Sequence, residues 1–498
     1  MKVLLMEYPW LDRETHHYTV YRWYGAFPNP AIAVIGGALR AANIAFDIFD
    51  AKLEDLTIEQ SLERLRACAP DIVGLSAFTT DIYFANQFAG LIKQEFPNCV
   101  VVVGGPHSTV MPAKTLEEFP YFDIAVIAEG EKVMVKIVET LRAGEDITSI
   151  PNIAWRSSGG KAVVNPYDKA LECHDLDDIG TPVWEMFPPG EMYHVQTTRG
   201  CPFPCEFCYR LTGTKVRHKS PENVAREIET ILSLTRPDHI FFSDPTFGLN
   251  KKKVYPVLDA LIAANIAERV PWKTTARFST TDEELLTRMK RAGCVSIFFG
   301  VESGDPEISA VAKQNIDIDR ANKMLALCRK LGIYTLGGFI FGHPGETKKS
   351  VWETVKLSLR MRFDLIVIGI MVPWPGTQVY EYARRGERGY KLVAADWRNF
   401  DKHFGSCVKF DNFDGNFLPR LRLFNYILFY LRWAKFGALA KEAFSKAAII
   451  RRFLTASIFG AQRKDLKQTD MDIFLSQRRP VSAAKDFVRA EGLNEISQ

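Results

Sequence analysis

Residues 197–209 read Thr197-Thr198-Arg199-Gly200-Cys201-Pro202-Phe203-Pro204-Cys205-Glu206-Phe207-Cys208-Tyr209. Three cysteines lie close together here, in a loop that follows an apolar strand pattern and contains a glycine and two prolines that cannot continue a strand. Three soft thiolates at the spacing C-x₃-C-x₂-C can converge on one iron–sulfur cluster. A [4Fe–4S] cluster normally takes four cysteines, so three would leave one iron open to another ligand.

A zinc site is the alternative interpretation of the same cysteines, with His218 or His194 as the fourth ligand. The other cysteines are scattered, and we expect them to be structural: Cys68, Cys99, Cys173, Cys294, Cys328 and Cys407. Because the chain opens without a secretory signal pattern, its nine cysteines do not indicate a disulfide framework. A cytoplasmic protein is therefore expected.

The cysteine loop opens a series of alternating strands and helices between residues 191 and 400. Strand patterns occur at 193–197, 239–243, 272–276, 295–299, 334–341 and 365–371, and amphipathic helix patterns occur at 221–234, 253–264, 282–292, 319–331 and 348–361. This alternation predicts a parallel, TIM-like (βα)6 barrel, complete or partial. Such barrels carry their chemistry on the loops that follow the strands.

A second α/β series fills residues 1–150. Strand patterns at 2–6, 46–49, 71–78, 100–104 and 124–127 alternate with helix patterns at 31–42, 58–67, 83–95 and 131–141. They predict a Rossmann-like parallel sheet, in which ligands bind beyond the carboxyl ends of the strands. Those ends carry Ser76, Thr79, Thr80, Gly104, Gly105, His107, Glu129 and Gly130. Ordinary turn chemistry explains these residues equally well at this point.

The remaining regions differ in composition. Residues 151–190 are rich in glycine, proline and serine and are expected to be a linker. Residues 401–498 hold 17 Lys/Arg and 10 Asp/Glu, a net charge of +7, against +4 for the whole chain. Within them, residues 418–455 predict a basic, aromatic helix that either caps the barrel or lies on a membrane surface.

The overall composition excludes several classes of protein. With 47% apolar residues in 498, the chain is not disordered and is long enough for two to four domains. No apolar run is long enough for a transmembrane helix. The nearly neutral whole chain gives no reason to expect nucleic-acid binding.

At this point the sequence resembles the radical S-adenosylmethionine superfamily, whose signature is C-x₃-C-x-aromatic-C, with Phe207 in the aromatic place. Similar motifs follow later strands at 243–247, 299–304, 338–347 and 372–377. Residues 1–150 resemble the cobalamin-binding domain that precedes such barrels, through Gly-Gly-Pro-His at 104–107 and Glu-Gly-Glu at 129–131. The resemblance covers about residues 1–400 and points to the cobalamin-dependent members. That class includes anaerobic tetrapyrrole cyclases, hopanoid methylases and natural-product methyltransferases.

The resemblance implies that Cys201, Cys205 and Cys208 hold a [4Fe–4S] cluster whose open iron binds the amino and carboxylate groups of S-adenosylmethionine. One electron would cleave that cofactor to a 5′-deoxyadenosyl radical, which abstracts a hydrogen atom from the substrate. The residues expected around S-adenosylmethionine are Phe207, Asp244, Glu302 and Gly342. Glu302 would lie beside the ribose or amino group, although a strand-end ion pair is the alternative, and Gly342 would flank the adenine.

Cobalamin is the third implied cofactor, cradled by the strand ends that carry Ser76, Thr79, Thr80, Gly104, Gly105, His107, Glu129 and Gly130. The D-x-H-x-x-G motif that supplies a histidine lower ligand is missing, because His16, His17 and His107 have no aspartate two positions before them. Cobalamin is therefore expected to bind without a histidine lower ligand. A domain that has lost the cofactor is the alternative.

Three hypotheses of function follow. The first is a methyltransferase that acts on an unactivated carbon of a hydrophobic or tetrapyrrole-like substrate. The second is an anaerobic oxidative cyclase that acts on a magnesium-porphyrin-type substrate with the same cofactors. The third is an iron–sulfur or zinc sensor without enzymatic activity, which would not need motifs at the strand ends around the whole barrel. The family also implies a low-potential flavodoxin or ferredoxin as electron donor.

Overall fold

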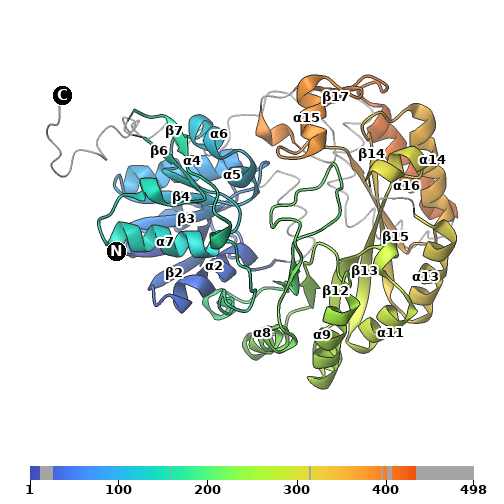
Figure 1. Ribbon diagram of the computed structural model, residues 1–498, viewed down its shortest axis with the longest axis horizontal. Helices are drawn as coiled ribbons and strands as arrows, with labels where there is room; N and C mark the ends of the chain where they lie inside the picture. Colours follow the sequence, from blue (N-terminus) through green and yellow to red (C-terminus); the bar gives the residue numbers. More distant parts are fainter. Residues whose placement is uncertain (12–25, 158, 313–315, 394–395, 401–406, 433–498) are drawn as a thin grey trace. The chain divides into compact units, whose positions relative to one another are not determined.

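The computed structural model describes residues 1–11, 26–157, 159–312, 316–393, 396–400 and 407–432. The described residues form two compact units, one over residues 1–190 and the other over residues 191–432. Figure 1 shows both units coloured along the chain. Each unit is built around its own mostly or wholly parallel sheet, as the sequence predicts.

Unit 1 contains a seven-stranded sheet in the order β2-β1-β3-β4-β5-β6-β7. Its strands are β1 (Val3–Glu7), β2 (Phe46–Asp50), β3 (Ile72–Ser76), β4 (Val100–Gly104), β5 (Ile124–Val126), β6 (Ile153–Arg156) and β7 (Ala162–Val164). The first five strands are parallel and match the predicted ones. Since the chain passes from β1 to β2 on one side and to β3 on the other, the order reverses between β1 and β3, where ligands of such sheets bind.

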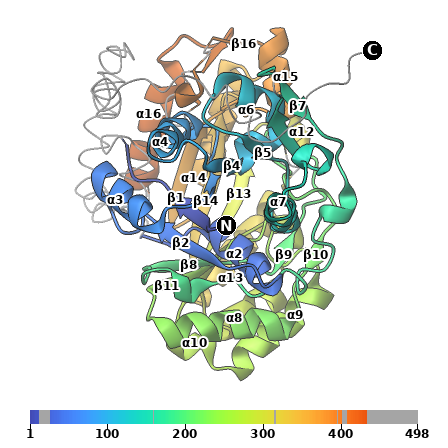
Figure 2. The ribbon, with the colours of Figure 1, turned by 90° about the vertical axis from the view of Figure 1, so that its left-hand side faces the viewer.

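Helices cover both faces of this sheet. In Figure 2, α3 (Ile58–Cys68) and α4 (Ile82–Glu95) lie on one side of the strands, and α2 (Pro30–Ala41) and α7 (Glu131–Arg142) lie on the other. Helix α2 begins where its sequence requires, because Pro30 occupies the first turn and the Asn29 side chain accepts hydrogen bonds from the Ala31 and Ile32 amides. Two short helices, α5 (Pro106–Val110) and α6 (Pro112–Glu118), follow β4.

Residues 151–190, predicted as a linker, continue unit 1 instead. Strands β6 and β7 add an antiparallel edge to the sheet beside β5. Ile153 and Ala154 are fully buried there, and Asn165 donates hydrogen bonds to the Thr148 and Ile150 carbonyls. Glycine and proline between these short strands resemble a linker in composition, whereas the buried apolar residues pair with the sheet.

Unit 2 contains the six-stranded parallel sheet that the sequence predicts, in the order β15-β14-β13-β12-β11-β8. Its strands are β8 (Met192–Val195), β11 (His239–Phe242), β12 (Trp272–Ala276), β13 (Cys294–Glu302), β14 (Tyr334–Phe341) and β15 (Leu365–Ile370). The strand order follows the chain order, so each strand lies beside the next, as in a barrel wall. The predicted partial (βα)6 barrel is confirmed.

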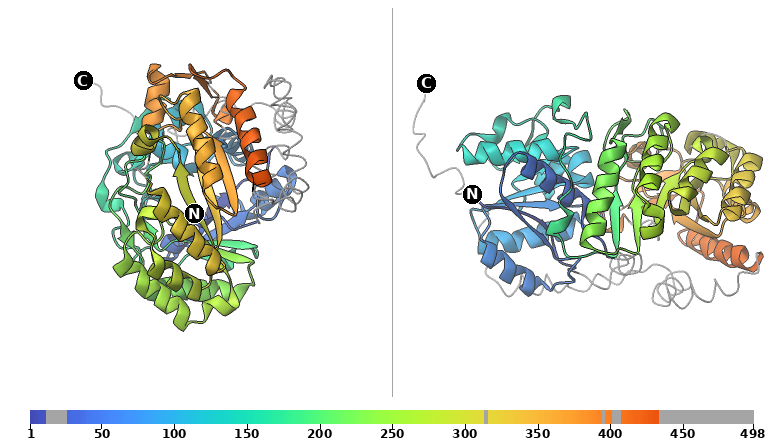
Figure 3. Two further views of the ribbon diagram at one scale, coloured as in Figure 1. Left: turned by 90° about the vertical axis from the view of Figure 1, so that its right-hand side faces the viewer. Right: turned by 90° about the horizontal axis from the view of Figure 1, so that it is seen from below.

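The helices of unit 2 lie in a row on the outer face of this sheet (Figure 3). They are α8 (Pro221–Leu234), α9 (Lys251–Ala263), α11 (Glu283–Arg291), α13 (Ile318–Lys330) and α14 (Lys348–Arg360), with the short α10 (Ile266–Arg269) and α12 (Pro306–Ala312) between them. Amphipathicity explains this placement. In α11, for example, Leu285, Leu286 and Met289 are fully buried against the sheet side.

The basic, aromatic region begins with α16 (Phe417–Arg432), which confirms a helix in the part of residues 418–455 that the structure describes. This helix packs beside α14 and β15: the Tyr426 hydroxyl accepts a hydrogen bond from the Ile368 amide at 2.9 Å, and Asn425 accepts one from Ser358. Residues 433–455 lie outside the described residues. Among the helices that the structure describes, none has the length and apolar character needed to span a bilayer.

Candidate functional site

The cysteine loop joins two short antiparallel strands at the carboxyl end of β8. These strands are β9 (Thr198–Arg199) and β10 (Arg217–His218), and they close the loop at its base. Inside it, the Cys201 amide donates to the Gly213 carbonyl at 3.1 Å and the Cys208 amide donates to the Cys205 carbonyl at 3.2 Å. The backbone of the loop is therefore held by its own hydrogen bonds, and the Cys208 thiol donates to the Tyr209 carbonyl at 3.3 Å.

None of the three cysteines forms a disulfide, and none is deeply buried. Cys201 and Cys205 are half-buried and Cys208 is exposed, unlike Cys99, Cys173, Cys294, Cys328 and Cys407, which are buried. Burial raises the pKa of Cys294 above its ordinary value and that of Cys328 to about 12, as expected for inert structural thiols. The sixth remaining cysteine, Cys68, is half-buried in unit 1, far along the chain from the loop.

The cysteine loop offers three sulfur donors of the kind that bind a four-iron cluster. Among the described residues, no three His, Cys, Asp or Glu side chains lie close enough to share one metal ion. In a four-iron cluster each cysteine binds a different iron, so the three sulfurs need not meet at one point. Of the two histidines named for the zinc alternative, His194 lies in β8 with its ring 5.2 Å from that of Phe241, and His218 lies in β10, whose backbone pairs with Thr198.

Asp244 fixes the entry to the cysteine loop. It follows β11, is 3% exposed, and accepts hydrogen bonds from the Thr197 amide at 2.7 Å, the Thr198 amide at 3.1 Å and the Thr197 hydroxyl. Sequence analysis predicts this carboxylate as a contact of S-adenosylmethionine. In the structure both of its oxygens are already engaged by the loop, which gives it a supporting role.

Glu206 and Tyr209 tie the same loop to the end of the sheet. The Glu206 carboxylate accepts a hydrogen bond from Tyr382 of α15 (Gln378–Arg385) at 3.1 Å and lies 3.8 Å from Arg388. The ring of Tyr209 lies 6.0 Å from that of Trp374, in the loop after β15. The cysteine loop is thus anchored at both ends of the six-stranded sheet.

Glu302 ends β13 in a strained conformation. Its φ is +69°, a left-handed value that a residue with a side chain adopts at a cost, and the register of β13 shifts there. Glu302 is 8% exposed. Strain of this kind is typical of functional sites, which agrees with the predicted role of Glu302 near S-adenosylmethionine.

Gly342 and His343 follow β14 and reach the cysteine loop. Gly342 has φ +85°, and a Cβ there would meet Phe410 at 2.8 Å and Leu418 at 3.0 Å, so only glycine fits. The His343 ring packs edge-on against Phe207, with the ring centroids 6.0 Å apart, and hydrogen-bonds the Glu302 backbone. The structure therefore brings Phe207, Glu302 and Gly342 to one edge.

His343 and Glu346 are buried polar residues that sequence analysis quoted only as part of a motif. Burial lowers the pKa of His343 to about 4, so the ring is neutral near pH 7, and its Nε2 atom is buried without a hydrogen-bond partner. Glu346 accepts hydrogen bonds from the Gly342 and His343 amides, and burial raises its pKa to about 8. Glu346 therefore shapes the turn that follows β14.

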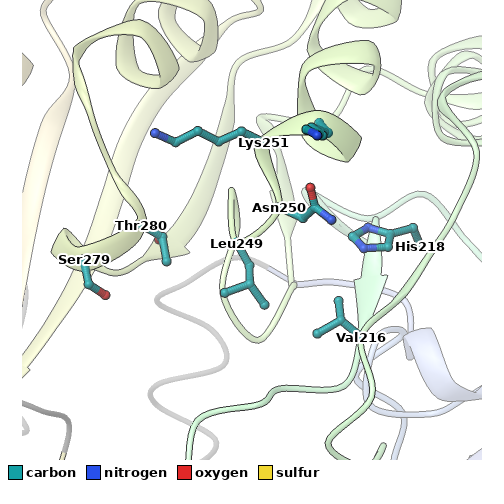
Figure 4. Close-up of a pocket in the computed structure, with 8 residues that line it drawn as sticks. Val216, His218, Leu249, Asn250, Lys251, Ser279 and Thr280 are labelled. Carbon is teal, nitrogen blue, oxygen red and sulfur yellow. The ribbon is translucent and has the colours of Figure 1, made fainter.

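A cavity of about 650 Å³ opens beside the hairpin that closes the cysteine loop (Figure 4). It is lined by Val216, His218, Leu249, Asn250, Lys251, Lys252, Ser279 and Thr280. In Figure 4, Asn250 and His218 point toward one another and Lys251 extends away from them. These residues come from β10 and the position before it, from the loop after β11 with the first turn of α9, and from the turn after β12. They lie at the edge where such sheets carry their chemistry.

The candidate cobalamin edge of unit 1 is built from the loops after β3 and β4. Gly105 has φ +103°, and a Cβ there would lie 2.7 Å from the Ala77 carbonyl, so the two loops touch backbone to backbone. Thr79 and His107 are 1% and 0% exposed, with the Thr79 hydroxyl 3.2 Å from His107 Nδ1. Burial lowers the pKa of His107 to about 4. This pair ties the loop after β3 to the helix that follows β4.

The other predicted residues of this edge separate into two groups. Four of them are only partly buried, so a ligand at this edge can reach them: Ser76, Thr80, Gly104 and Gly130. Glu129 is 7% exposed, and its carboxylate accepts a hydrogen bond from the Cys173 amide at 2.7 Å. It therefore braces residues 151–190 within unit 1.

Sequence analysis missed a charged cluster after β1. Glu7 pairs with Lys52 at 2.5 Å, and Lys52 lies 3.5 Å from Asp81 and 4.1 Å from the centre of the Tyr8 ring. Burial raises the pKa of Glu7, and it raises that of the neighbouring Asp50 to about 7. The cluster lies where the strand order reverses. Its only sequence signal is the acidic residue at the end of each of two strands.

Comparison with known proteins agrees with this arrangement. Residues 195–358 match the model of the radical SAM superfamily, and residues 20–138 match that of the B12 binding domain. The chain is 31% identical to an uncharacterized methyltransferase of Pyrococcus horikoshii, over 77% of this chain and 84% of the relative. It is 27% identical to an anaerobic magnesium-protoporphyrin IX monomethyl ester cyclase of Rubrivivax gelatinosus, over 91% and 85%.

Solved structures share the fold. The radical S-adenosylmethionine methyltransferase TsrM of Kitasatospora setae, with cobalamin and a [4Fe–4S] cluster bound, superposes with a TM-score of 0.65 at 18% identity, covering 81% of each chain. The two α/β sheets, the loop with its three cysteines and the two matching family models therefore support the same conclusion. The chain belongs to the B12-binding radical S-adenosylmethionine enzymes, whose members homologous to it are methyltransferases and magnesium-porphyrin cyclases.

Proposed function

We propose that this enzyme is a methyltransferase that acts on an unactivated carbon of a hydrophobic or tetrapyrrole-like small molecule. The observation that carries the proposal is the 31% identity to a methyltransferase that aligns over 84% of its length. When bound, the cluster, S-adenosylmethionine and cobalamin supply radical hydrogen abstraction and methyl transfer. The chain's own residues bind these groups, orient them and exclude water.

We assign Cys201, Cys205 and Cys208 as the cluster ligands, because they share one loop in which none of them forms a disulfide or is deeply buried. Glu302 and Gly342 are assigned to S-adenosylmethionine, because both adopt left-handed backbone conformations at the same edge as the loop. Asp244 and Phe207 support the site without binding the cofactor directly. Asp244 holds the start of the cysteine loop, and Phe207 packs on His343.

The cluster assignment is tested by replacing one ligand. Anaerobically reconstituted full-length protein should hold about four irons per chain and form 5′-deoxyadenosine from S-adenosylmethionine when reduced. Cys205→Ala should lose both properties. Cys68→Ala is the matched control, since Cys68 is also a half-buried free thiol but lies in unit 1. Full iron content and turnover in Cys205→Ala would refute the assignment.

For cobalamin we propose binding at the β3 and β4 edge of unit 1 without a histidine lower ligand. The support is that His107 is fully buried and already bound to Thr79, while the strand-end glycines leave the edge open. His16 and His17 lie outside the described residues. The protein should take up cobalamin with a base-off absorption spectrum, and a histidine-ligated spectrum would contradict this proposal.

A cyclase acting on a magnesium-porphyrin-type substrate is the second candidate, favoured by the alignment with a cyclase over 91% of this chain. The products separate the two candidates. Methylation consumes a second S-adenosylmethionine and releases S-adenosylhomocysteine with each methylated product, whereas cyclisation releases 5′-deoxyadenosine without it. Magnesium-protoporphyrin IX monomethyl ester is the probe: ring closure without S-adenosylhomocysteine would overturn the methyltransferase proposal in favour of the cyclase.

The electron for the cluster is proposed to come from a low-potential flavodoxin or ferredoxin, as in the family. Either donor should replace dithionite in the 5′-deoxyadenosine assay. Failure of both protein donors, with dithionite still active, would exclude this class of donor.

A further inference from the structure

An arginine that follows β12 contacts the cysteine loop beside one of its sulfurs. Arg277 directly follows β12 and is 7% exposed. Its Nη1 atom lies 3.8 Å from the Cys205 sulfur as a hydrogen-bond donor, and its guanidinium carbon lies 3.5 Å from the centre of the Phe203 ring. Sequence analysis gave this residue no role, and the cluster assignment does not require it.

The backbone around Arg277 is fixed. Its carbonyl accepts hydrogen bonds from the Thr281 hydroxyl at 2.7 Å and the Thr280 hydroxyl at 3.2 Å, within the short 3₁₀ turn Phe278–Thr280. The Phe203 ring lies against the guanidinium, and such a cation–π contact gains strength when water is excluded. Hydrogen bonds hold the backbone of Arg277, and the Phe203 ring packs on its guanidinium. The side chain is therefore fixed beside the Cys205 sulfur.

A guanidinium in this place carries a permanent positive charge. Arginine does not lose its proton in proteins, and near-complete burial weakens the screening of its charge by water. The reduction potential of an iron–sulfur cluster depends on the net charge around it and on hydrogen bonds to its sulfurs. Arg277 contributes to both, through its charge and through the bond to Cys205.

We propose that Arg277 tunes the reduction potential of the cluster and makes its one-electron reduction more favourable. The electron comes from a low-potential flavodoxin or ferredoxin, and in the test below from dithionite. Arg277 stabilises the negative charge gained by the cluster, keeps its own proton, and forms or breaks no covalent bond. The proposal rests on the assignment of Cys201, Cys205 and Cys208 as cluster ligands.

A purely mechanical role is the competing explanation, in which Arg277 only holds Phe203 and the loop in place. The two explanations differ in what a loaded protein shows. A mechanical role predicts lower cluster content with an unchanged potential, whereas tuning predicts a changed potential in protein that carries its full cluster.

The test is a redox titration of the anaerobically reconstituted full-length protein, followed by the electron paramagnetic resonance signal of the reduced cluster. Arg277→Met removes the charge and keeps an unbranched side chain, and Arg277→Gln removes the charge but keeps an N–H donor. Arg269→Met is the matched control, because it removes the same charge from an exposed arginine paired with Glu229. Iron content is measured for every sample.

We expect the ratio of reduced to oxidised cluster at a fixed potential to fall roughly tenfold in Arg277→Met, the effect of losing one hydrogen bond to a charged group. Arg277→Gln should fall between this variant and wild type, and Arg269→Met should match wild type. A wild-type ratio in fully loaded Arg277→Met would overturn the proposal. Lower iron content in Arg277→Met, with a wild-type ratio in the molecules that keep their cluster, would also overturn it, in favour of the mechanical role. Absence of a cluster from wild type would instead refute the cluster assignment itself.

Discussion

Two glycines in the turn after β14 allow packing and backbone strain to be measured separately. Gly342 and Gly345 have similar left-handed φ values, +85° and +79°. A Cβ at Gly345 would find nothing within 4 Å, whereas a Cβ at Gly342 would meet Phe410 at 2.8 Å and Leu418 at 3.0 Å. Alanine at either position carries the backbone strain, but only alanine at Gly342 also carries the clash.

The magnitudes follow from this difference. A left-handed conformation costs a residue with a side chain about 1–2 kcal/mol. The clash adds about 1–3 kcal/mol, the usual cost of overpacking, because the Phe410 ring is itself held by Tyr390 at a centroid distance of 5.3 Å. Gly342→Ala should therefore be about 1–3 kcal/mol less stable locally than Gly345→Ala, or roughly 5- to 150-fold in the opening equilibrium.

The assay is hydrogen exchange followed by mass spectrometry on peptides that cover residues 334–347. It reports local opening without requiring that the two units unfold as one. Peptides from unit 1 serve as the internal control and should exchange at wild-type rates in both variants. Equal exchange in the two variants would refute the claim that close packing is what requires glycine at Gly342.

Other predictions concern the loop entry, the candidate cobalamin edge and the pH dependence of the turn after β14. Asp244→Asn should reduce iron loading, because it weakens the hydrogen bonds to the loop at a cost of about 1–3 kcal/mol. Asp238 is exposed, so Asp238→Asn is the control and should take up iron normally. Equal iron content in the two variants would contradict the role of Asp244. Gly105→Ala should lower cobalamin uptake because of its clash with Ala77. Gly144→Ala is the control: it also has a left-handed backbone, in the turn after α7, but a Cβ there would meet nothing within 4 Å, so this variant should bind normally in the same spectroscopic titration. Burial raises the pKa of Glu346 from 4.5 to about 8. Local stability of the wild type, compared with Glu346→Gln, should therefore fall by roughly 3–5 kcal/mol as the pH rises from about 5 to 8. If the ratio of the two exchange rates did not depend on pH, this would argue against a buried, titrating carboxyl.

The regular α/β pattern is what made the fold predictable. Strands of continuous apolar residues, such as Val100–Gly104, separated by amphipathic helices have few alternatives to a parallel sheet. Residues 151–190 were harder, because β6 and β7 are short and lie among glycine and proline. Their place in the sheet depends on pairing with β5, which no local pattern reveals.

Site residues that belong to a local sequence motif could be predicted, whereas residues that reach the site only through tertiary contacts could not. Three cysteines in one loop indicate their own role, and the predicted neighbours Phe207, Glu302 and Gly342 meet at one edge. Arg277 lies 72 residues from Cys205 in the sequence, and no local motif marks it. Asp244 was found by its motif, but its engagement by Thr197 could be seen only in the folded chain.

The hydrogen bond between Glu129 and the Cys173 amide has a practical consequence for dissecting this enzyme. The matched B12-binding region ends at residue 138, and a fragment cut near residue 150 would lack the Cys173 amide that Glu129 binds. It would also lack β6, so the apolar strand β5 would become an unpaired edge of the sheet. Such an edge invites aggregation through intermolecular strand pairing. A fragment that runs to residue 190 keeps β6, β7 and the Cys173 segment, and it is the shortest N-terminal piece expected to stay monomeric on its own.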